Sequence, residues 1–77
     1  MSPIVFKWHG FQFYVRPEKE RRAHIHVYGH GGSAKFWLEP TVSLSKTTGL
    51  SKRDLLQLWT VVDERKDQLI ETWHEYH

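Results

Sequence analysis

The chain is 77 residues long, with 11 Lys and Arg against 9 Asp and Glu and a net charge of +2 at pH 7. This length predicts a single domain, residues 1–77. The absence of cysteine excludes disulfide and thiolate chemistry. No apolar run is long enough to span a membrane, and Met1–Gly10 lacks signal-peptide features, so we expect a cytoplasmic protein with no membrane partner. The mild positive charge permits an RNA, ribosome or acidic-protein partner without selecting among them.

The first part of the chain has the period of β-structure. Apolar residues alternate with other residues over residues 4–8 and again over residues 11–15. The two stretches meet near His9–Gly10, which predicts two strands joined by a turn at that point.

A charged segment, residues 16–22, follows these strands and contains Pro17. Its composition is typical of a mobile, solvated loop. The alternative is a loop that contacts phosphate groups, because arginine side chains donate paired hydrogen bonds to phosphate oxygens. The candidate nucleic-acid-binding residues in this segment are Arg16, Arg21 and Arg22.

The next segment predicts a β-hairpin with two chemically different faces. If His30 pairs with Ser33 across a Gly31–Gly32 turn, one face is apolar throughout. The residues of this apolar face are Ala23, Ile25, Val27, Ala34, Phe36 and Leu38. On the other face, the same register places His24 opposite Glu39, His26 opposite Trp37, and Tyr28 opposite Lys35.

The second face of the hairpin is the candidate site. Histidine exchanges protons near neutral pH, and a carboxylate opposite it can orient the ring, so His24, His26, Glu39 and Tyr28 are candidate catalytic residues. Lys35 is a candidate nucleic-acid ligand on the same face. A His-x-His pair on a strand can also bind a metal, but spacing fixes no third ligand, so we expect neither a metal nor another cofactor. The structural alternative is a polar patch whose histidines only hydrogen-bond neighbouring loops.

After Pro40, residues 41–44 are expected to form a short edge strand, followed by a turn over residues 46–49. The apolar period then becomes helical. Ser51 is a good N-cap, with Asp54 three residues later. The pattern predicts one helix from about residue 51 to residue 75, about 37 Å long at 1.5 Å per residue.

A helix of that length overhangs a small sheet. Its C-terminal part would then offer Trp73 and Tyr76 to a partner chain, which predicts a homodimer or a complex with another protein. The alternative is that both side chains complete the core. The whole pattern predicts an α+β fold: an antiparallel sheet of three to five strands, within about residues 3–44, packed against one long C-terminal helix.

Four segments of the chain form a recognisable combination: His24–Val27 behind a basic loop, Ala34–Pro40, Gly49–Ser51 and Trp73–Tyr76. In these segments the chain resembles a family of small prokaryotic proteins known as Domain of Unknown Function 4160. The His-x-His strand of the family matches His24 and His26, and many members have a proline where this chain has Ala23. Members are often encoded beside another small protein, as in toxin–antitoxin modules. The resemblance therefore implies a toxin-like protein with a cognate protein partner encoded next to it.

Three functions are compatible with these features. The first is a toxin-like component that acts on RNA or the translation machinery, with metal-independent RNA cleavage as its chemistry, because such cleavage needs a base, an acid and a cation. The second is a non-catalytic protein-binding module. The third is an antitoxin or regulator, which the absence of a helix-turn-helix pattern and of a disordered tail disfavours.

Overall fold

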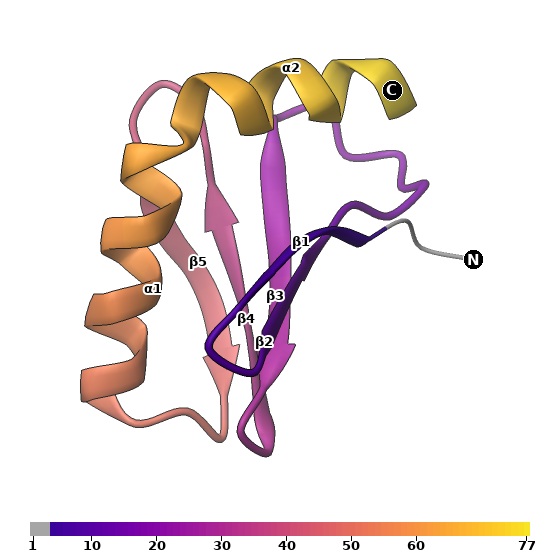
Figure 1. The fold of residues 1–77 in the computed structure, drawn as a ribbon. Coiled ribbons are helices and arrows are strands. Elements are labelled where there is room, and N and C mark those ends of the chain that lie inside the picture. The colour runs from indigo at the N-terminus through magenta and orange to yellow at the C-terminus, as the bar shows by residue number, and fades with distance from the viewer. Residues whose placement is uncertain (1–3) are drawn as a thin grey trace.

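The computed structural model describes residues 4–77 and confirms an α+β fold. Five antiparallel strands form one sheet in the order β1-β2-β3-β4-β5, and two helices follow them (Figure 1). The strands are β1 (Ile4–Trp8), β2 (Phe11–Tyr14), β3 (His24–Gly29), β4 (Gly32–Trp37) and β5 (Ser43–Thr48), and the helices are α1 (Lys52–Glu64) and α2 (Lys66–Tyr76). Residue 3, where the strand region was expected to begin, lies outside the described residues.

Two tight turns set the first hairpins. His9 and Gly10 have φ values of 48° and 83°, and His30 and Gly31 have φ values of 52° and 81°. Positive φ at both central residues is the geometry that matches the twist of an antiparallel pair. The predicted turn near His9–Gly10 is therefore confirmed.

The predicted register of the second hairpin is wrong by two residues. Gly29 pairs with Gly32, so His30 and Gly31 form the turn instead of Gly31 and Gly32. Position 32, within β4, requires glycine because a Cβ atom there would collide with the carbonyl of Thr48 on β5. A shift of two residues leaves every side chain on its predicted face.

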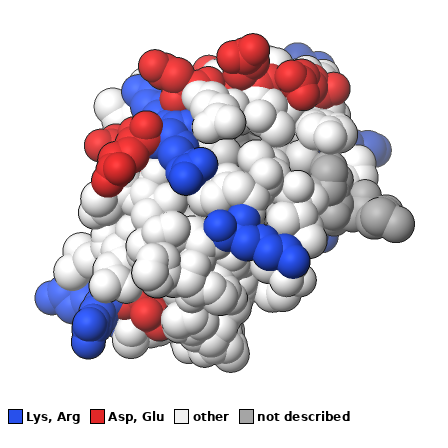
Figure 2. All heavy atoms as spheres, viewed as in Figure 1, with Lys and Arg blue, Asp and Glu red and all other residues white. Residues whose placement is uncertain are grey.

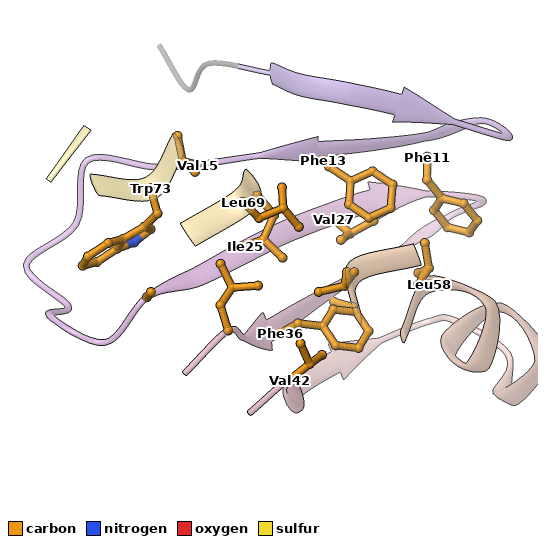
Figure 3. Close-up of a cluster of buried hydrophobic side chains, with 14 residues drawn as sticks. Phe11, Phe13, Val15, Ile25, Val27, Phe36, Val42, Leu58, Leu69 and Trp73 are labelled. Carbon is orange, nitrogen blue, oxygen red and sulfur yellow. The ribbon is translucent and has the colours of Figure 1, made fainter. Parts of the chain in front are cut away.

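The apolar face of the sheet and the two helices enclose the core (Figure 3). All six hairpin residues predicted for this face are buried. The other buried core residues are Phe11, Phe13, Val15, Val42, Leu58, Val62, Leu69 and Trp73. Burial of these large side chains is the main source of stability in a domain of this size.

The edge strand β5 begins and ends later than predicted. The expected turn over residues 46–49 is wrong, because Lys46, Thr47 and Thr48 continue the strand and pair with β4. Thr47 also donates a hydrogen bond of 2.8 Å from Oγ1 to the Ser33 carbonyl. The strand shows little apolar alternation because most of its residues lie at a solvent-facing edge.

The single long helix is also wrong. Ser51 caps α1 as predicted, and its side chain accepts a hydrogen bond from the Asp54 amide. The helix breaks at Arg65, and α2 then crosses the end of the sheet (Figure 1). A straight helix over residues 51–75 would be about 37 Å long, which exceeds the largest extent of the chain, 30 Å. The break lets both helices bury apolar residues on one small sheet.

The break removes the predicted overhang. Trp73 is 4% exposed and belongs to the core, whereas Tyr76 is 51% exposed. Trp73 is therefore packed into the core of its own chain, as the structural alternative expects, and the expected homodimer loses this part of its basis. Among residues 4–77, neither helix has the length and apolar character needed to cross a membrane.

Candidate site: a Glu–His–His cluster beside a cationic cleft

The face of the sheet opposite the core carries the polar residues. Strand pairing places Tyr14, His26, Lys35 and Lys46 side by side in one row across β2, β3, β4 and β5. His24 lies two residues before His26 on β3 and pairs with Trp37. The sequence therefore assigns both histidines to the correct face.

Glu18 brings the two histidines together. Its Oε1 atom lies 2.9 Å from His24 Nε2 and 2.6 Å from His26 Nε2. His24 is 1% exposed and His26 is 5% exposed, while the Glu18 side chain is 29% exposed. The cluster therefore has a buried histidine end and an acidic end that reaches solvent.

The backbone determines the tautomer of His24. Its Nδ1 lies 2.7 Å from the Arg22 carbonyl oxygen. A carbonyl only accepts hydrogen bonds, so His24 Nδ1 carries a proton and donates it. His24 Nε2 then faces the Glu18 carboxylate with either a second proton or a lone pair.

The charges of the cluster respond to burial and to hydrogen bonding. Burial acts to raise the pKa of Glu18, but hydrogen bonds from His24 and His26 outweigh it and hold the pKa at about 2. Burial lowers the pKa of His26 from its ordinary value, although the Glu18 carboxylate acts in the opposite direction. At neutral pH the site therefore contains a carboxylate anion and, at His26, a ring that favours the neutral form.

Aromatic rings enclose His24. The ring of Trp37 lies 5.8 Å from it, that of Trp73 6.1 Å and that of His77 6.2 Å, each measured between centroids. Trp73 and Glu18 also line an open groove of about 620 Å³. Within the described residues, Trp73 Nε1 is the one buried side-chain polar atom without a hydrogen-bond partner.

A second, smaller cleft of about 240 Å³ has His26 in its lining. Three basic residues line it, Arg16, Lys35 and Lys46, together with Tyr14. The Tyr14 ring stacks on the His26 ring at a centroid distance of 5.3 Å. His26 therefore borders both the cationic cleft and the cluster with Glu18.

The structure does not unite all the predicted site residues. Glu39 is not opposite His24; its backbone carbonyl accepts a 2.7 Å hydrogen bond from Arg22 Nε. Tyr28 is exposed, pairs with Ser33 instead of Lys35, and its hydroxyl donates to the Gln12 side chain. The pairings predicted for Glu39 and Tyr28 are wrong because the register differs by two residues.

The basic residues that were predicted to bind nucleic acid do not lie on one surface. Arg16 and Lys35 line the cationic cleft, whereas Arg21 lines the larger groove with Glu18. Arg22 lies over the Trp37 ring at 4.4 Å, and Lys35 lies over the same ring at 4.3 Å. These contacts hold two cations beside an aromatic ring.

Sequence reasoning missed two residues of the site. Glu18 lies in the segment interpreted as a solvated loop, and Lys46 lies in the segment interpreted as a turn. A carboxylate six residues before one histidine and eight before the other was the available signal for Glu18. Loop conformation, which that spacing does not determine, brings the carboxylate to the histidines.

The fold and site define a small α+β protein with a Glu–His–His cluster on the outer face of an antiparallel meander. A family model described as Domain of unknown function (DUF4160) matches residues 10–74. The chain therefore belongs to this family, as the resemblance indicated. No curated protein and no solved structure matches the chain.

Proposed function

We propose that this protein is the toxin-like component of a prokaryotic two-gene module and that it acts in the cytoplasm by binding RNA across the outer face of its sheet. The observation that carries the proposal is the cationic cleft, where Arg16, Lys35 and Lys46 surround Tyr14 and His26. Phosphate groups supply most of the affinity in nucleic-acid binding through contacts with such basic side chains.

Aromatic side chains on the same face support single-stranded RNA as the ligand. Tyr28 is 45% exposed, and Tyr14 lies beside it with a ring-centroid distance of 5.5 Å. Sheet-surface aromatic residues stack on unpaired bases, and each stacked base contributes about 1–3 kcal/mol.

The basic groups of the cleft are not neutralised by acidic side chains. The salt bridges found among residues 4–77 all involve histidine, so Arg16, Lys35 and Lys46 have no acidic partner there. Acidic side chains gather instead along α2, at the top of the view in Figure 2. The acidic residues of this helix are Asp67, Glu71 and Glu75. This distribution favours the sheet face over α2 as the surface that a polyanion contacts.

The test is fluorescence anisotropy with a labelled single-stranded RNA at several salt concentrations. We expect the Lys35→Ala and Lys46→Ala double variant to lose affinity and to flatten the plot of log K against log salt by about 1.4, or about 0.7 for each lost phosphate contact. The matched control is Arg53→Ala together with Lys52→Ala, two exposed basic residues on α1. Equal losses in both variants would contradict a specific role for the cleft.

Expression in a bacterial host tests the toxin-like role. We expect growth arrest by the protein alone, relief by the neighbouring gene, and no arrest by the cleft double variant. Absence of arrest by a folded wild-type protein that still binds RNA would favour a binding module or regulator instead.

A further inference from the structure

We propose that Glu18, His24 and His26 bind one divalent transition-metal ion, with Zn²⁺ as the best match. Each residue offers one ligand atom, and these three atoms all lie within 4.8 Å of one another. The proposed ion binding does not depend on RNA binding. Only the identity of the fourth ligand, discussed below, rests on the proposed function.

The contacts of His24 direct its Nε2 atom at Glu18. His24 Nδ1 donates to the Arg22 carbonyl, so Nε2 is the ring atom that is left to meet the carboxylate. His24 Nε2 lies 2.9 Å and His26 Nε2 lies 2.6 Å from the same Glu18 oxygen, Oε1. In the metal-free protein these contacts are hydrogen bonds to the carboxylate, and a divalent ion would take the place of the Nε2 protons.

The surroundings of the cluster favour the metal ion. A metal-binding histidine typically donates its other ring N–H to a backbone carbonyl or carboxylate, as His24 does to Arg22. His24 and His26 lie on one strand with perpendicular rings, at 89° and a centroid distance of 5.0 Å. The Tyr14 ring, stacked on His26, limits rotation of the second ligand. Two of the three ligands are therefore held in place before the ion arrives.

The ligand types decide which metals suit the site. Imidazole nitrogen suits zinc, copper, nickel and iron, whereas magnesium and calcium prefer oxygen ligands alone. Two histidines and one glutamate form the protein ligands of hydrolytic zinc sites, which keep a fourth position for water or substrate. The partly exposed Glu18 and the cleft beside His26 leave the cluster open on two sides.

The cleft suggests what occupies the fourth position. A phosphate oxygen of a ligand held by Arg16, Lys35 and Lys46 would lie on the His26 side of the ion. A bound divalent ion polarises a phosphoryl oxygen and stabilises negative charge that develops on it. This assignment of an RNA phosphate as the fourth ligand rests on the proposed function.

The test uses the full chain without a histidine tag, freed of metal with EDTA. Titration with Co²⁺ should produce the visible absorption bands of a four-coordinate site and saturate at one equivalent. Competition with Zn²⁺ against a chromogenic chelator then gives the affinity. We expect His24→Ala, His26→Ala and Glu18→Gln each to weaken metal binding by about tenfold or more. Mutating residues that only hydrogen-bond the metal ligands already lowers metal affinity by about 10–100-fold.

Two controls keep the result interpretable. His74→Ala removes an exposed histidine of α2 and should leave metal affinity unchanged. Glu18→Gln keeps the size of the side chain, and circular dichroism of each variant verifies that it is folded. Failure of the folded wild-type protein to bind Zn²⁺ or Co²⁺ stoichiometrically would overturn the proposal, as would unchanged affinity in Glu18→Gln.

Measuring RNA anisotropy with and without the ion separates the two proposals. RNA binding that survives while metal titration fails rejects the metal site alone. Metal binding without any effect of Lys35 and Lys46 on RNA affinity rejects the proposed function alone.

Discussion

Replacing His24 with alanine will destabilise the metal-free protein by about 2–4 kcal/mol. His24 is 1% exposed and forms hydrogen bonds at both ring nitrogens, with the Arg22 carbonyl and with Glu18. Its loss leaves a carbonyl and a carboxylate, both in part-buried contacts, each without one donor, at about 1 kcal/mol for each. The missing ring also leaves a cavity among Trp37, Trp73 and neighbouring side chains.

Thermal unfolding followed by circular dichroism in EDTA measures this loss. For a domain of this size, 1 kcal/mol corresponds to about 4–8 °C in Tm, so we expect Tm to fall by about 10–30 °C. The control His74→Ala removes an exposed imidazole and should change stability by less than about 0.5 kcal/mol. A similarly small change in His24→Ala would refute the structural reasoning.

The same variant separates a structural from a chemical role of His24. If His24 only holds the loop, the growth arrest caused by His24→Ala should fall in proportion to the folded fraction. A variant that is fully folded at low temperature yet inactive there would show that the imidazole takes part in the chemistry.

Three further predictions concern the scaffold and the loop. Gly32→Ala should lower stability by about 1–3 kcal/mol in urea unfolding, because its Cβ would meet the Thr48 carbonyl of β5; an unchanged midpoint would contradict the role assigned to this glycine. Ser51→Ala should cost about 1 kcal/mol through loss of the α1 N-cap, and Ser51→Asp should restore it. In metal-free protein, stability should fall as pH drops from the ordinary pKa of Glu18, 4.5, toward its folded pKa of about 2, because the unfolded chain takes up the proton first. His26, whose pKa is lowered, adds an earlier loss below pH 6.5, and Glu18→Gln should remove the lower part of the acid transition.

The faces of the strands could be predicted because they depend on a local pattern with a period of two residues. Ile25 and Phe36 are buried, and His26 lies on the opposite face, although the register is shifted by two residues. Both Gly31–Gly32 and His30–Gly31 suit a tight turn. The choice between them depends on the approach of β5 to Gly32, a contact between distant parts of the sequence.

The glutamate of the site could not be predicted for a related reason. Residues 16–22 have the composition of a solvated loop, and Arg16, Arg21 and Arg22 are indeed exposed. Glu18 differs from its neighbours only in where the loop places it. Its amide donates a 2.9 Å hydrogen bond to the Arg16 carbonyl, and its side chain turns toward β3. Composition describes the average environment of such a loop, but not the conformation of one residue in it.

The break between α1 and α2, which the sequence did not predict, also helps to build the site. A continuous helix along the direction of α1 would extend past the sheet, whereas α2 crosses its end and contacts β3. This path places Trp73 against His24 and stacks it on His77 at 4.2 Å. The rings of Trp73 and His77 close one side of His24, and the Glu18 loop closes another. The size limit that prevents one long helix therefore also buries the histidine end of the cluster, which leaves Glu18 and His26 as the residues through which a ligand can reach it.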